Sequence, residues 1–200
     1  MESATPWYVP LARAVPALAL ALVVTFSADH SAPLGLVTFG IFGVVAGAVL
    51  TASALRLGAK GVVRTVTFAQ GILTVLAGIV SLALPGAGLP FFVFLLTAFA
   101  AVTGFLELYL GLRSRGRSGS SRDWVFVGGL TALLAIAVLL VPPGYSQSFS
   151  GPDEVQRVLT ASVIVVGALG AYWAILGVYL VIAGLSLRWA DSSSLVKSEA

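Results

Sequence analysis

Apolar residues fill six long runs of this chain, and polar residues gather between the runs. An α-helix needs about 20 mainly apolar residues to cross the hydrocarbon core of a bilayer, which is roughly 30 Å thick. Each run has about that length, so the pattern predicts six membrane-spanning helices. They cover about residues 9–27, 34–55, 62–84, 89–112, 124–141 and 158–187.

The first and last runs depart from the length of an upright span. The uninterrupted part of the first, residues 14–26, is short enough to be the core of a secretory signal, and Arg13 precedes it. This run is therefore either a retained first helix or a cleaved signal. The last run is too long, so it tilts, breaks near residues 167–171, or begins outside the membrane.

One helical pattern occurs more than once. GILTVLAGIVSLALPG (71–86) returns 58 positions later as GLTALLAIAVLLVPPG (129–144), and FGVVAGAVLTASALR (42–56) aligns with FAAVTGFLELYLGLR (99–113). Similarity at a fixed offset marks a repeated supersecondary unit. The unit is an out-going helix opened by Arg, a Pro-Gly turn, and a returning helix that ends in Leu-Arg.

The predicted fold is all-α, a polytopic membrane domain over 1–200 with six transmembrane helices. They form three parallel helical-hairpin repeats, at about 9–55, 62–112 and 124–187, and residues 191–200 form a polar cytoplasmic tail. We expect each out-going helix to pack against its own returning helix, because the connection LPGAGLP is short. Gly71 and Gly129 should then be equivalent.

Composition supports a membrane protein and excludes several classes of function. Of 200 residues, 58% are hydrophobic and only 10% are charged, far from ordinary soluble composition. The net charge of +3 does not indicate nucleic-acid binding, because the basic residues form no single surface and are not interleaved with aromatic ones. The chain has no cysteine, which excludes disulfides and thiolate chemistry.

The basic residues also predict an orientation. Ten of the eleven Lys and Arg fall on one side of the predicted spans, and only Arg157 falls on the other. By the positive-inside rule both termini are cytoplasmic. The loop 113–122 is interpreted as a solvated determinant of topology; binding of anionic lipid headgroups is an alternative that is compatible with this role. The ten residues are Arg13, Arg56, Lys60, Arg64, Arg113, Arg115, Arg117, Arg122, Arg188 and Lys197.

No catalytic, cofactor or metal site is predicted. The single histidine, His30, lies in the turn SADHSAP, as a solvated residue or a weak proton-sensing or metal-binding one. A zinc or di-iron site needs several converging ligands, and no phosphate-binding loop is present. Gly43 and Gly47 form a GxxxG motif that lets helices approach closely, within one bundle or between copies in a homo-oligomer.

Glu107 is the single acid inside a predicted span. A charge within the membrane is costly and is usually paired or functional. Arg64 and Arg122 enter neighbouring spans from the same side, and their long side chains can reach it. We predict an ion pair between Glu107 and one of them, Arg64 first because it belongs to the same hairpin. The pair is either structural or a latch that opens in acid.

The repeat resembles the short-repeat membrane proteins of the HdeD acid-resistance type. The resemblance is carried by Arg64 with the helix 71–86, by the returning helix 99–113, and by Arg122 with the helix 129–144. It implies a six-helix bacterial inner-membrane protein associated with acid or general stress, with no established catalytic activity. We therefore expect a non-enzymatic protein that supports acid or envelope stress tolerance. The alternative is a small transporter or channel, which usually places polar groups along its path.

Overall fold

The computed structural model describes residues 6–56, 61–116, 118–150 and 156–198, the last eight by their backbone alone. Lys60 and Arg117 of the predicted basic side, and the end of the polar tail at 199–200, lie outside these residues, as does the side chain of Lys197. The elements are α1 (Tyr8–Phe26), α2 (Ala32–Arg56), α3 (Gly61–Ala83), α4 (Gly88–Arg113), α5 (Ser121–Leu139), β1 (Ser146–Ser150), β2 (Gln156–Thr160) and α6 (Ala161–Ser198).

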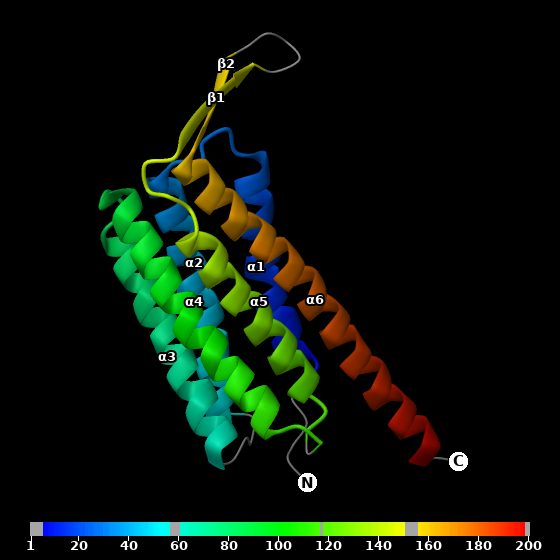
Figure 1. The fold of residues 1–200 in the computed structure, drawn as a ribbon. Coiled ribbons are helices and arrows are strands. Elements are labelled where there is room, and N and C mark those ends of the chain that lie inside the picture. Colours follow the sequence, from blue (N-terminus) through cyan, green and yellow to red (C-terminus); the bar gives the residue numbers. More distant parts are fainter. Residues whose placement is uncertain (1–5, 57–60, 117, 151–155, 199–200) are drawn as a thin grey trace.

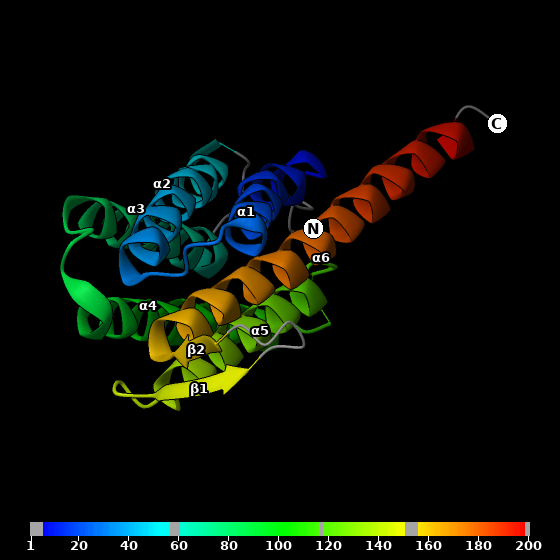
Figure 2. The same ribbon diagram turned by 90° about the horizontal axis from the view of Figure 1, so that it is seen from above.

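The predicted all-α class and the six long apolar helices are confirmed. Within the described part of the chain, six helices are long and apolar enough to cross a membrane. They run alternately up and down (Figure 1) and form a closed ring in which α6 lies against α1 (Figure 2). We call the end that carries Arg56, Arg64 and Arg113 the basic end, and the opposite end, which carries β1 and β2, the hairpin end.

The connection between α5 and α6 holds a feature that the sequence analysis did not predict. Strands β1 and β2 pair antiparallel, with Ser146 opposite Thr160, and project beyond the bundle (Figure 1). Val158 therefore belongs to a strand, and the last helix begins at Ala161. That helix continues without a break through residues 167–171 and extends past the other helices at the basic end.

The closest helix pairs differ from those predicted. The most extensive contacts join α2 to α3, α4 to α5, and α1 to α6. The helices connected at the hairpin end, α1 to α2, α3 to α4 and α5 to α6, touch far less. Each out-going helix does contact its own returning helix, as expected, but its contacts with a helix of a neighbouring repeat are more extensive. A short turn brings two helix ends together, but small residues along the facing sides decide where backbones approach over their whole length.

Glycines show how closely α2 and α3 approach. A Cβ added at Gly47 would lie 2.7 Å from the Val75 nitrogen and 2.8 Å from the Gly71 oxygen. A Cβ at Gly78 would lie 2.6 Å from the Val44 nitrogen. Both helices therefore contact through their backbones, and the glycines of the predicted close-packing motif serve contacts within the bundle.

The pair α4–α5 repeats this packing with a shift of 57 residues. A Cβ at Gly104 would lie 2.9 Å from the Ala132 nitrogen and 3.1 Å from the Gly128 oxygen, as Gly47 does with Val75 and Gly71. Gly128 is therefore the structural counterpart of Gly71. Gly129, which was predicted to be that counterpart, has no atom within 4 Å of an added Cβ. The out-going helices were aligned one residue out of register, because apolar letters and the Pro-Gly turn dominated the match.

The pair α1–α6 is a third copy, made from the two ends of the chain. A Cβ at Gly177 would lie 2.6 Å from Leu18 Cγ, and a Cβ at Gly184 would lie 2.7 Å from Leu11 Cγ. The seven-residue spacing of Gly177 and Gly184 matches that of Gly104 and Gly111, whose contacts are also seven residues apart on α5. The bundle thus has an approximate threefold repeat of tightly packed helix pairs.

Candidate functional site

The threefold repeat brings equivalent positions together at the centre of the bundle. Aligning the pairs on Gly47, Gly104 and Gly177 makes Leu50 equivalent to Glu107, and Phe42 equivalent to Phe99 and Tyr172. A small cavity of about 20 Å³ lies at this centre. It is lined by Arg13, Phe42, Ala46, Leu50, Gln70, Thr74, Phe99, Thr103, Glu107, Thr131 and Tyr172.

The cavity contains a salt bridge between the first and fourth helices. Arg13 Nη2 donates to Glu107 Oε1 at 3.1 Å. Glu107 is six residues before Arg113 at the end of α4, about 9 Å deep at a rise of 1.5 Å per residue. Its side chain is only 4% exposed, and that of Arg13 is 15% exposed. This pair is a buried electrostatic contact that crosses the centre of the ring.

The predicted partners of Glu107 are not its partners. Arg64 and Arg122 are both exposed at the basic end, and among the described residues Glu107 forms its salt bridge with Arg13. Arg64 lies in the first turn of α3, and Arg122 lies in the first turn of α5. The sequence analysis placed Arg13 on the basic side, just before the uninterrupted apolar part of the first run, and gave it no partner. Its place within the first helix was the signal available in the sequence, because a charge inside a span usually has a partner.

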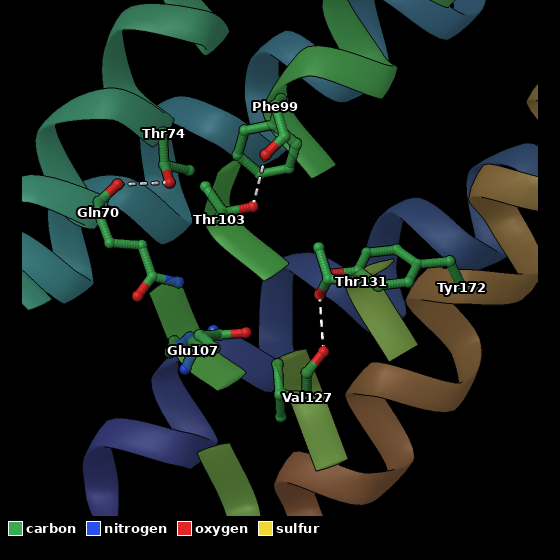
Figure 3. A network of polar contacts seen from close by, with 9 residues as sticks. Gln70, Thr74, Phe99, Thr103, Glu107, Val127, Thr131 and Tyr172 are labelled. Atoms are coloured by element: carbon green, nitrogen blue, oxygen red, sulfur yellow. Dashed lines mark hydrogen bonds and ion pairs between the residues drawn. The ribbon is translucent and has the colours of Figure 1, made fainter. Parts of the chain in front are cut away.

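Five other buried polar side chains line the cavity, and Figure 3 shows them beside Glu107: Gln70, Thr74, Thr103, Thr131 and Tyr172. Each threonine donates its hydroxyl to a carbonyl one turn back: Thr74 to Gln70 at 2.7 Å, Thr103 to Phe99 at 2.7 Å and Thr131 to Val127 at 2.8 Å. Such bonds satisfy a hydroxyl inside a helix without an outside partner.

Positions that are polar in one helix pair are apolar in another. Gln70 on α3 is equivalent to Val127 on α5 and to Arg13 on α1, and Glu107 is equivalent to Leu50. The repeat therefore supplies the scaffold, and single substitutions on it supply the polar centre. Sequence analysis could not place these residues together, because the register of the out-going helices was out by one residue.

An aromatic layer closes the cavity toward the hairpin end. Phe42 packs at 5.3 Å from Trp173, and Phe99 packs at 5.0 Å from Phe39, as measured between ring centroids. Trp173 and Phe39 are fully buried. The aromatic rings come from three different helices, α2, α4 and α6. They form a packed plug beyond the polar residues.

The turn that contains His30 has a structural role. Asp29 accepts hydrogen bonds from the Ser31 nitrogen and hydroxyl, both at 2.9 Å, just before α2 begins. These bonds fix the turn between α1 and α2, as Asx-turn geometry does. In the described part of the chain no three His, Cys, Asp or Glu side chains gather where they could hold a metal ion.

Comparison with known proteins gives one match. Residues 69–141 match the model of a short repeat of unknown function, DUF308. The match covers most of α3, all of α4 and all of α5, so it includes Gln70, Glu107 and Thr131. No curated protein and no solved structure matches the chain. The chain is thus a multi-pass membrane protein that contains this repeat.

Proposed function

We propose that the protein is a non-enzymatic, HdeD-like inner-membrane protein that supports acid or envelope stress tolerance. The repeat match carries no known activity, so the argument rests on the buried salt bridge. Removing one partner of a buried pair strongly destabilises a protein, because it leaves an unpaired charge in an apolar environment. A bundle held across its centre by Arg13 and Glu107 fits a structural role in the membrane.

The groups that face Glu107 matter for any response to acid. Arg13 on α1 is its ionic partner, and Tyr172 on α6 is the other titratable group that lines the cavity. The lining residues from α2, α3 and α5 carry no charge. Proton uptake by Glu107 would therefore remove the carboxylate that forms the salt bridge with Arg13. This geometry supports the latch alternative as a variant of the same function.

The alternative function is a small transporter or channel. The cavity of about 20 Å³ is near the size of one water molecule, and the aromatic plug lies beyond it. A transport path usually needs a continuous series of polar groups and broken helices. The unbroken α6 and the aromatic layer favour the structural role.

The proposed role is tested in a deletion strain challenged with acid and with envelope-damaging detergent. Wild type should restore survival, and Glu107→Leu should restore it poorly at equal protein level. Phe105→Leu is the matched control, because Phe105 lies on the same helix and is 66% exposed on the outside of the bundle. Equal survival of the deletion and the complemented strain under both stresses would remove the proposal.

The proposed orientation places the basic end in the cytoplasm and both termini there. Because the chain has no cysteine, each introduced thiol is unique. Gly119→Cys, at the basic end, should react with a membrane-impermeant thiol reagent only in inverted vesicles. Ser148→Cys, on the exposed strand β1, should react in intact cells. The reverse pattern would contradict the orientation.

A further inference from the structure

Several polar groups that line the central cavity have hydrogen-bonding capacity that no other group of the protein satisfies among the described residues. Arg13 contacts Glu107 through one nitrogen and one carboxylate oxygen. Within the described part of the chain, no hydrogen bond reaches Glu107 Oε2 or the side-chain amide of Gln70. Gln70 is nevertheless only 4% exposed, and it points toward Glu107 (Figure 3). A buried amide of this kind requires a partner.

The hydrogen bonds of Thr131 and Tyr172 show which donors and acceptors remain unused at the cavity. Thr131 donates its hydroxyl hydrogen to the Val127 carbonyl. In the 3.0 Å contact between the Thr131 and Tyr172 hydroxyls, Tyr172 is therefore the donor. The Tyr172 oxygen keeps lone pairs that can accept. The amide nitrogen of Gln70 and the remaining nitrogens of Arg13 can still donate. The cavity therefore presents both donors and acceptors.

We propose that this cavity is a binding site for a single water molecule, which bridges Gln70 to the Arg13–Glu107 salt bridge. A buried water needs about 10–15 Å³ of space for its centre and two to four polar partners. The cavity of about 20 Å³ meets the first condition, and Gln70, Glu107 and Arg13 meet the second. The ligand is neutral, because the two charges already balance each other and an ion of either sign would meet a like charge.

The water site ends at the aromatic layer. Tyr172 lines the cavity, whereas the next residue, Trp173, is fully buried against Phe42 and does not line it. The indole nitrogen of Trp173 has no hydrogen-bond partner among the described residues. Two neighbouring residues of α6 therefore lie in different surroundings: Tyr172 faces the hydrated polar cavity, and Trp173 lies in the dry aromatic layer. This contrast does not depend on the role in stress tolerance.

The site is tested by X-ray radiolytic labelling of the full chain in lipid nanodiscs. Radicals formed from a bound water oxidise the side chains beside it even when these are buried. Tyr172 should be oxidised several-fold faster than Trp173, and tandem mass spectrometry separates the two residues. Equal protection of both would show a dry cavity and overturn the proposal. Equal labelling of both would show water beyond the aromatic layer and overturn it in favour of a channel.

A variant tests the bridging role of Gln70. Gln70→Leu removes the amide that holds the water, so the labelling of Tyr172 should fall several-fold toward that of Trp173. Thr97→Val is the control, because Thr97 has a buried hydroxyl but does not line the cavity. Its labelling pattern should match wild type. Unchanged labelling of Tyr172 in Gln70→Leu would overturn the bridging role of Gln70. If that variant does not fold, the ratio of Tyr172 to Trp173 oxidation in the wild type still decides whether the cavity holds water.

Discussion

The helix pairs α2–α3 and α1–α6 pack in the same register but are held together by different means. In α2–α3 the helices follow each other in the chain, and glycines on both sides let backbones touch. In α1–α6 the helices lie at opposite ends of the chain, and glycines of α6 meet leucine side chains of α1. The salt bridge of Arg13 joins the second arrangement to the rest of the ring.

This difference teaches where a membrane bundle needs a specific polar contact. Apolar surface gives little preference for a partner helix over lipid, so association depends on packing and polar bonds. In the pairs α2–α3 and α4–α5 the short connection between consecutive helices already holds the two helices close together. The pair α1–α6 has no such connection, and α1 is the helix that carries Arg13, the arginine of the salt bridge. Val127 and Gln70, the equivalents of Arg13, are uncharged.

The largest expected effect comes from breaking the salt bridge. Glu107→Leu should lower the free energy of unfolding by about 3 kcal/mol, because the mostly enclosed Arg13 would lose its carboxylate partner. Adding Arg13→Val should recover most of the loss, since Leu50 and Val127 already occupy the equivalent positions. Unfolding in detergent followed by circular dichroism measures both. Additive losses would contradict the pairing, and the same cycle with Arg64→Val should show no coupling.

The next effect contrasts the two kinds of helix contact. Gly78→Ala should cost about 2 kcal/mol, because its Cβ would meet backbone atoms of α2 that cannot move independently. Gly177→Ala should cost less, about 1 kcal/mol, because it meets the flexible side chain of Leu18. Gly129→Ala is the control and should be neutral or stabilising. Equal costs at Gly78 and Gly177 would remove the contrast.

A smaller effect concerns a second bond that attaches α6. Tyr179 donates its hydroxyl to Asp123 of α5 at 2.6 Å, and its ring stacks on Phe126 at 4.0 Å. Tyr179→Phe keeps the stacking and loses the hydrogen bond, so stability should fall by about 1 kcal/mol. Tyr109→Phe, on the exposed side of α4, provides the comparison and should change little. A similar fall in both variants would argue against the Asp123 bond.

The last comparison concerns two threonine hydroxyls, one with an expected loss and one with none. Thr131→Val deprives the Tyr172 hydroxyl of its acceptor and should cost about 1 kcal/mol. Thr97 has a buried hydroxyl without a partner among the described residues, so Thr97→Val should be neutral or slightly stabilising. Thermal unfolding of the two variants side by side gives the sign of the difference. A larger loss at Thr97 would be inconsistent with the polar centre.

The sequence alone determined the class of the protein and the number of its spans. The length of each apolar run and the scarcity of charge were enough, because a bilayer has a fixed thickness and penalises charge. Pattern similarity also revealed the repeat. Glu107 was recognised as an intramembrane acid that needs a partner, because such residues are costly. The hairpin formed by β1 and β2 was missed, since each strand has only five residues.

Only the tertiary structure decided which helices pair, in what register, and which arginine meets Glu107. In a helix that is apolar on every side, hydrophobic periodicity does not distinguish the face toward lipid from the face toward the bundle. Gly128 and Gly129 are adjacent and chemically identical, yet only Gly128 lies in the contact. Arg13 and Glu107 are 94 residues apart and meet because α6 closes the ring against α1. That closure depends on the packing of all six helices, so no local segment of the sequence encodes it.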